Sequence, residues 1–242
     1  MKEQTFNKWF NIFILAGMTV CVILSTIFKM QEPEARQTLL VISAFGALMG
    51  VVSTVLSANG SLWNFLFGLI DVSIYSYILF DSQMPSQFLL HVLYIIPMEF
   101  VGIFQWRKRG ADGKKAVKAR RLNGKSALLY GLLFLGVLAA TSAISYFAIL
   151  KAGGEVNLQK SILDALVTTA NIVALVMMAF AYMEQWYLWT LVNLSSVVLW
   201  TITLLTEPQV GYAVIPIVKY SFYFINGING IRIWCKLSRE QA

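Results

Sequence analysis

The chain has 242 residues, of which 58% are hydrophobic and 13% are charged, and its mean hydropathy is +0.68. A soluble globular domain is nearer half apolar and a quarter charged, so this composition excludes one. The net charge of +7 does not indicate a nucleic-acid partner, because nine of the nineteen Lys and Arg residues fall in one loop, residues 107–125.

The apolar residues gather in runs of about 20, the length that crosses a ~30 Å hydrocarbon core. The first run is too long for a signal-peptide core and lacks a small-x-small cleavage pattern, so it is predicted to be retained. The sequence therefore predicts an all-α integral membrane protein. Its eight predicted transmembrane helices are at residues 7–28, 38–57, 61–80, 86–106, 126–150, 161–182, 186–206 and 211–235.

The basic residues predict the orientation of these spans. Loops rich in Lys and Arg stay in the cytoplasm, so residues 107–125 are expected inside. Alternation then puts both termini inside as well. This side holds fourteen basic residues, nine in the loop and five near the termini, against four outside. Orientation and contact with anionic membrane lipid account for the charge of the loop.

Short sequence matches predict an internal duplication, which transporters commonly carry. GIFQW ends the fourth span and GIRIW ends the eighth, at an offset of 128, and Trp63 matches Trp189 at an offset of 126. These matches predict two three-helix repeats, residues 38–106 and 161–236. Corresponding helices are four spans apart, so the repeats are parallel. An extra N-terminal helix (1–30) and a basic loop with a linker helix (107–150) complete a 1+3+1+3 architecture.

Polar residues inside the spans predict a central cavity, because hydrocarbon offers no hydrogen bonds and such residues face protein or water. Six acids and amides near the midplane or in the cytoplasmic half come from five spans, and all five spans belong to the repeats: Asp71, Glu99, Asn171, Asn193, Asn226 and Asn229. Interhelical hydrogen bonding is an equally good explanation for any one asparagine. The two acids could instead pair with Lys219 or tyrosine hydroxyls, or carry a coupling proton.

Trp186, Trp189 and Asn193 share one face of the seventh span, because they fall at i, i+3 and i+7. Trp186 is at the cytoplasmic boundary, where tryptophans also serve as membrane anchors. A tryptophan that only anchors a helix at the membrane interface does not need a buried asparagine on the same helix face. A flat polar ligand needs both, because it is held by aromatic stacking and by hydrogen bonds. A cationic ligand would gain about 0.5–2 kcal/mol from the indole faces. This face is therefore predicted to be one wall of a binding site.

The arrangement Glu184-x-Trp186-x-x-Trp189-x-x-x-Asn193 resembles a signature of the PnuC family of bacterial vitamin transporters. The stretches GLIDVSIYSYILF, VGIFQWRK and NGIRIW add to the resemblance, which covers residues 38–236. It implies a full-length SWEET-like fold in the bacterial inner membrane. It also implies uptake of nicotinamide riboside by facilitated diffusion, with trapping by a cytoplasmic kinase that phosphorylates it. One departure is His91, where the family's first repeat is expected to carry a glutamine.

The resemblance implies that the two tryptophans and Asn193 belong to the substrate site. Depth and helix face extend the predicted site to Asn226, Asn229, Gln105, Asp71, Glu99, Tyr223 and Asn171. In this hypothesis Asn193 and Asn226 bond the carboxamide, and Gln105 or Asn229 bonds the ribose. Asp71 or Glu99 offsets the positive charge of the pyridinium.

Other functions are compatible with parts of the sequence. Thiamine or another nucleoside-like vitamin is the alternative substrate, and a membrane-bound sensor without flux is an alternative of another class. A membrane enzyme would need clustered nucleophiles or metal ligands, which one histidine and two distant cysteines do not supply. We therefore predict no catalytic residue, metal or cofactor. The sequence has no P-loop pattern, which argues against direct ATP drive and favours alternating access of two repeats around a central site.

Overall fold

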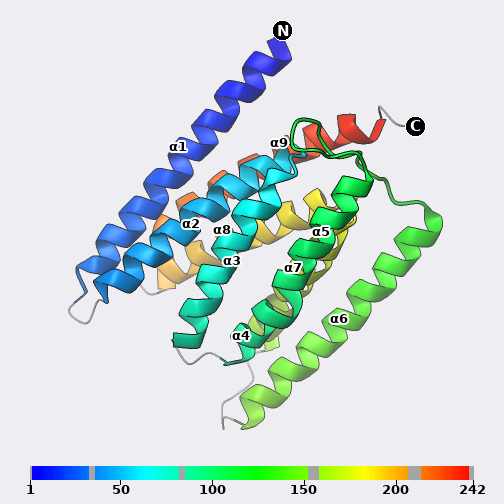
Figure 1. Ribbon diagram of the computed structural model, residues 1–242. Helices are drawn as coiled ribbons and strands as arrows, with labels where there is room; N and C mark the ends of the chain where they lie inside the picture. The colour runs from blue at the N-terminus through cyan, green and yellow to red at the C-terminus, as the bar shows by residue number, and fades with distance from the viewer. Residues whose placement is uncertain (1, 33–35, 82–84, 152–157, 207–213, 240–242) are drawn as a thin grey trace.

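The computed structural model describes residues 2–32, 36–81, 85–151, 158–206 and 214–239, and these are mostly helical (Figure 1). The helices are α1 (Lys2–Met30), α2 (Gln37–Ala58), α3 (Trp63–Asp81), α4 (Pro85–Leu90), the π-helix η1 (His91–Ile95), α5 (Ile96–Lys108), α6 (Gly124–Lys151), α7 (Leu158–Ala179), α8 (Gln185–Thr206) and α9 (Val214–Arg239). Each predicted span overlaps one helix or, in the fourth case, the continuous run from α4 to α5.

Five stretches of the described chain are long and apolar enough to cross a membrane: Glu3–Met30, Gln37–Ala58, Trp63–Asp81, Phe88–Lys108 and Gly124–Phe147. The window in α6 contains no buried residue, and this helix stands at the edge of the structure and packs on α7 (Figure 1). Large apolar side chains such as Leu128, Leu132 and Phe147 point outward there. Exposing so large an apolar surface is unfavourable in water, whereas it is favourable in contact with lipid. The prediction of an all-α, multi-pass membrane protein is confirmed.

The fourth predicted span contains an irregular turn next to its proline. Pro97 has no N–H to donate to the carbonyl of Leu93, and its ring disfavours a regular α-helix before it. The structure has the π-helical turn His91–Ile95 immediately before the α5 helix that contains Pro97. Widened turns of this kind inside long helices are frequent at functional sites.

The helices of the two predicted repeats are interleaved. α2 pairs closely with α3, and α8 pairs with α9. Across the molecule α2 also contacts α9, while α5 contacts α7, so each half is held by helices of the other. α1 lies along both α2 and α9 (Figure 1). Its end is fixed by Glu3, which accepts a hydrogen bond from Lys236 at 2.9 Å.

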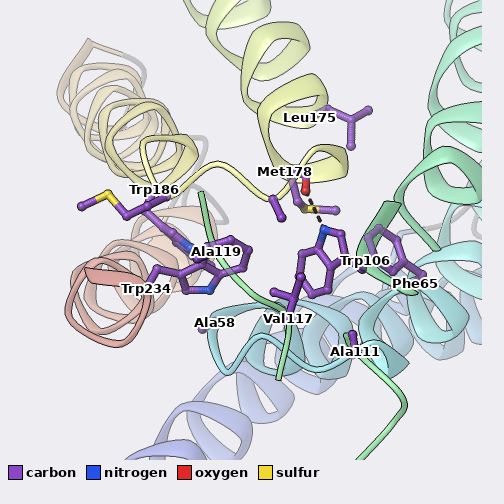
Figure 2. Packing of buried hydrophobic residues seen from close by; sticks show 12 residues of the cluster. Ala58, Phe65, Trp106, Ala111, Val117, Ala119, Leu175, Met178, Trp186 and Trp234 are labelled. Atoms are coloured by element: carbon purple, nitrogen blue, oxygen red, sulfur yellow. Dashed lines mark hydrogen bonds between the residues drawn. The ribbon is translucent and has the colours of Figure 1, made fainter. Parts of the chain in front are cut away.

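A chain of aromatic rings joins the two halves near the basic loop 107–125 (Figure 2). Phe65 packs edge-on against Trp106 at 4.8 Å, Trp106 against Trp234 at 5.3 Å, and Trp234 against Trp186 at 6.2 Å between ring centroids. The order runs α3, α5, α9, α8, so it crosses from the first half to the second. Offset and edge-to-face aromatic pairs are favourable beyond the area they bury.

Two of these indoles donate hydrogen bonds to the opposite half. Trp106 Nε1 of α5 donates to the carbonyl of Met178 at 2.8 Å, and Trp234 Nε1 of α9 donates to that of Ser57 at 3.0 Å. The two carbonyls occupy matching places near the ends of α7 and α2. A buried carbonyl left without a donor would be costly, so each indole fixes the helix end it bonds.

The predicted match of Trp63 with Trp189 pairs two residues that have different surroundings in the structure. The turns after α2 and α7 share one backbone feature: Gly60 and Ala181 both have positive φ, at +66° and 58°. These two residues are 121 positions apart. Trp63 is 52% exposed and bonds the loop carbonyl of Gly113, whereas Trp189 lies one helical turn inside α8.

Candidate functional site

A cavity of about 300 Å³ lies between α2, α7, α8 and α9. Its walls combine two indoles, two phenols, three primary amides and several hydroxyls. None of the described lining residues carries a charge. They are Ser53, Thr54, Ser57, Val167, Asn171, Met178, Trp186, Trp189, Val192, Asn193, Ser196, Tyr220, Tyr223 and Asn226.

The α8 wall contains the three residues of the sequence motif. Trp186, Trp189 and Asn193 all line the cavity, because the 3.6-residue period of the helix puts i, i+3 and i+7 on one side. Trp186 is only 4% exposed and packs against Trp234. The alternative that Trp186 is a membrane-belt anchor is therefore wrong. Trp189 and Asn193 are partly buried, as wall residues of an open cavity should be.

A glycine of α9 sets the position of the Trp186 indole. A Cβ at Gly230 would lie 2.5 Å from Cδ2 and Cε3 of the ring and 2.7 Å from Cζ3. The ring can rest flat on α9 only because this residue has no side chain. Gly227, one turn earlier, similarly leaves room for Thr190 of α8, whose Oγ1 would lie 2.9 Å from an added Cβ. These glycines explain how α8 and α9 approach closely enough to form one wall.

The structure adds lining residues that the sequence did not point to. Ser53 and Ser57 are one turn apart on α2 and line the cavity with Thr54 between them. Tyr220 of α9 lies one turn before Tyr223 and faces the same space. The i, i+4 spacing of Ser53 and Ser57 in an apolar helix could have indicated a cavity wall. The same spacing is also common in membrane helices that only pack against each other.

Two lining residues have buried polar atoms without a hydrogen-bond partner among the described residues: Nε1 of Trp186 and Oδ1 of Asn226. Asn226 is fully buried, and its Nδ2 donates to the carbonyl of Thr54 at 3.4 Å. One unpaired atom is a donor and the other an acceptor. Leaving such groups unpaired costs about 1–3 kcal/mol each, so a ligand that satisfies both would gain from it.

The ten predicted site residues divide into two groups. Six line the cavity: Trp186, Trp189, Asn193, Asn226, Tyr223 and Asn171. Asn171 also donates through Nδ2 to the carbonyl of Val167 in its own helix at 2.8 Å. Contact of these six with a substrate remains a prediction.

The other four predicted residues do not line the cavity. The Asp71 carboxylate packs against Gly50 of α2, and Glu99 Oε2 would lie 3.0 Å from a Cβ at Gly68 of α3. Asp71 therefore lies against α2 and Glu99 against α3, and neither is among the lining residues. Asn229 uses its Oδ1 to accept from Arg232 at 2.8 Å. Gln105 lies on α5, which contributes no lining residue. The distance along a helix predicted their depth, but it did not predict the direction in which they point.

His91 packs against Tyr75, with ring centroids 5.1 Å apart. It does not line the cavity. Within the described ranges, no group of three or more His, Cys, Asp or Glu side chains is arranged to hold a metal ion.

Comparison with known proteins gives a consistent result. The family described as nicotinamide mononucleotide transporter matches residues 40–236. A nicotinamide riboside transporter PnuC of Haemophilus influenzae is 29% identical over 235 residues, 96% of this chain and 90% of the relative. One from Neisseria mucosa is 28% identical over 205 residues, 83% of this chain and 74% of the relative.

The fold is also similar to a solved structure. The crystal structure of the vitamin B3 transporter PnuC superposes with a TM-score of 0.63 at 25% identity, covering 95% of this chain and 93% of that one. The family match spans most of the chain and includes every lining residue of the cavity. The protein therefore belongs to the nicotinamide mononucleotide transporter family, the PnuC transporters that its tryptophan motif resembles.

Proposed function

We propose that this protein transports nicotinamide riboside across the bacterial cytoplasmic membrane and that the cavity between α2, α7, α8 and α9 is its substrate site. The observation that supports this most strongly is the lining itself, which is uncharged and rich in aromatic rings and primary amides. Nicotinamide riboside is a planar pyridinium cation with a carboxamide and a hydroxyl-rich sugar. Indole faces attract a cationic ring without requiring a carboxylate in the cavity.

The unpaired atoms suggest how the carboxamide binds. A primary amide has one acceptor oxygen and a donor NH₂. Its oxygen would accept from Nε1 of Trp186, and its NH₂ would donate to Oδ1 of Asn226, the two atoms left without partners in the described chain. Trp189 and Asn193 would then hold the rest of the molecule, and the hydroxyls of Ser53 and Ser57 would meet the ribose.

The same lining favours the riboside over the mononucleotide. A phosphate carries up to two negative charges, and burying it without a cation is costly. Of the residues described around the cavity, none is Lys or Arg. Lys219 lies 5.6 Å from the centroid of the Tyr223 ring, behind the wall that this ring forms. We therefore expect the unphosphorylated nucleoside to bind and the phosphorylated product to be excluded.

For the architecture we propose eight transmembrane spans in a 1+3+1+3 order, with parallel repeats at residues 38–106 and 161–236 and a SWEET-like fold. Residues 1–30 are then the extra helix, and 107–150 the loop and linker helix. Two features support this arrangement. The positive-φ turns at Gly60 and Ala181 match, and the indoles of Trp106 and Trp234 donate reciprocally to the opposite half.

For the mechanism we propose facilitated diffusion by alternating access, with the two repeats rocking around the cavity. Both termini and the basic loop are cytoplasmic in this proposal. A cytoplasmic kinase would trap the product by adding a phosphate, which the uncharged cavity does not accommodate.

Proteoliposomes test the function directly. Purified protein should equilibrate labelled nicotinamide riboside across the bilayer without an ion gradient, and unlabelled nicotinamide riboside should compete better than thiamine or nicotinamide mononucleotide. Accumulation above equilibrium in liposomes that contain no kinase would overturn facilitated diffusion. Stronger competition by thiamine would assign the cavity to that vitamin, and binding without any flux would indicate a sensor.

A further inference from the structure

The loop that joins α5 to α6 is built into the core. We call residues 111–122 the strap. It bonds both the turn after α2 and the turn after α7, and its residues Val117 and Ala119 lie beside the aromatic rings (Figure 2). Three of its apolar side chains, Ala111, Val117 and Ala119, are buried in one cluster with Trp106, Trp186 and Trp234. A loop whose only role was to supply positive charge for membrane orientation would not need to bury these side chains.

On its first side the strap is attached to the α2–α3 turn. The N–H of Val117 donates to the carbonyl of Gly60 at 2.9 Å. The exposed indole of Trp63 donates to the carbonyl of Gly113 at 3.2 Å. The Cβ of Ala116 lies 3.3 Å from where a Cβ on Gly60 would be. This attachment therefore has one backbone hydrogen bond and one exposed side-chain hydrogen bond.

On its second side the strap is attached more firmly, to the α7–α8 turn. Arg120 donates through its N–H to Ala181 at 2.7 Å and accepts from Met183 at 2.9 Å, which forms a parallel bridge. The Arg120 guanidinium also lies 4.4 Å from the centroid of the Tyr182 ring.

The next residues extend this second attachment. The N–H of Leu122 donates to Oε1 of Glu184 at 3.0 Å, two residues before Trp186 of the cavity wall. The Arg121 guanidinium donates to Ser238 Oγ of α9 at 3.0 Å. The strap is thus bonded to the helix pair that presents the two indoles of the cavity.

The strap also closes the space below the cavity. Met178 and Trp186 line the cavity and belong to the same buried cluster as Val117 and Ala119. Ser57 and Met178 meet at the same level, where the Ser57 hydroxyl donates to the sulfur at 3.7 Å. On this side of the cavity the strap bonds both the Gly60 turn and the Ala181 turn.

From this geometry we propose that the strap is the cytoplasmic latch of the transporter. It holds the two turns together while the cavity is closed to the cytoplasm. It detaches from the Gly60 turn, and stays on the Ala181 turn, each time the cavity opens inward. The weaker attachment, to the Gly60 turn, is the one that must break. The stronger attachment, to the Ala181 turn, keeps the strap with the second half of the protein. This inference rests on the proposed transport function and identifies the segment that gates it.

A reversible cross-link tests the latch. In a protein with Cys21→Ala and Cys235→Ala, Gly60→Cys and Ala116→Cys put two Cβ atoms close to the 3.5–4.5 Å separation that a disulfide needs. Cysteine at a positive φ is strained, so the comparison is between the oxidised and reduced forms of the same protein. The Gly60→Cys single variant is the matched control. Flux is measured in proteoliposomes, and nicotinamide riboside binding is measured in detergent.

The oxidised double variant is expected to lose at least about tenfold in flux, to recover on reduction, and to bind nicotinamide riboside in both forms. Unchanged flux in fully cross-linked protein would overturn the latch, and so would failure of the disulfide to form. If the reduced protein and the cysteine-free parent both carried no nicotinamide riboside, the proposed function would be refuted, and the latch with it. Flux through the cysteine-free parent therefore distinguishes failure of the proposed transport function from failure of the latch proposal.

Discussion

The contact between Gly230 and the Trp186 indole makes Gly230→Ala the sharpest single test of the cavity. The added methyl would lie 2.5 Å from two ring carbons, whereas carbon atoms in contact are about 3.5–4.0 Å apart. Because both α9 and the ring are packed, the indole must move by about 1 Å. Overpacking of this kind costs about 1–3 kcal/mol. Part of that cost appears in stability, and the rest appears in affinity, because the displaced ring no longer fits the ligand.

We therefore expect Gly230→Ala to weaken nicotinamide riboside binding by about tenfold, which corresponds to ~1.4 kcal/mol, and to lower the melting temperature. Isothermal titration calorimetry and a thermal melt in the same detergent measure the two effects. Gly131→Ala in α6 is the matched control, because nothing lies within 4 Å of the added methyl there, and it should leave both unchanged. Wild-type affinity in folded Gly230→Ala protein would refute the packing argument and the role of Trp186 in the site.

Three further variants test other parts of the account. Trp189→Ala removes a stacking surface and should weaken binding by about 1–3 kcal/mol, or about 5- to 150-fold, by calorimetry; unchanged affinity would remove Trp189 from the site. Asn226→Leu removes the unpaired acceptor and should weaken binding of nicotinamide riboside at least about tenfold while affecting a ribosyl analogue that lacks the carboxamide much less; an equal loss for both ligands would contradict the carboxamide contact. Lys114→Cys in a cysteine-free background should react with an impermeant maleimide only after cells are opened; labelling in intact cells would reverse the proposed orientation.

Much of the fold could be predicted from the sequence because a bilayer imposes few choices. A span needs about 20 apolar residues, so run lengths indicated where helices lie. Helical period then put Trp186, Trp189 and Asn193 on one face, and the structure has all three on one cavity wall. The motif also pointed to the right family.

The positions of the two acids could not be predicted in the same way. Depth in the membrane is read from residue number, but the direction of a side chain depends on which neighbour packs on which face. Asp71 and Glu99 are at cavity depth, yet their carboxylates fit against glycines of neighbouring helices. Nothing in the sequence indicates that carboxylates would occupy the space beside these glycines.

The strap was missed for a different reason. The loop 107–125 has nine basic residues, five of them in the strap, and their charge explains orientation without reference to the three buried apolar residues of the strap. Val117 is fully buried although its neighbours Ala116 and Lys118 are not. No period marks such a residue in a segment without regular structure, so only the packed structure identifies it.

A structure of the protein with nicotinamide riboside bound tests the central claim most directly. The account predicts the pyridinium ring between the indoles of α8 and the tyrosines of α9, with its carboxamide within hydrogen-bond distance of Trp186 Nε1 and Asn226 Oδ1. Density for the vitamin anywhere else, with this cavity filled by side chains or water alone, would contradict it.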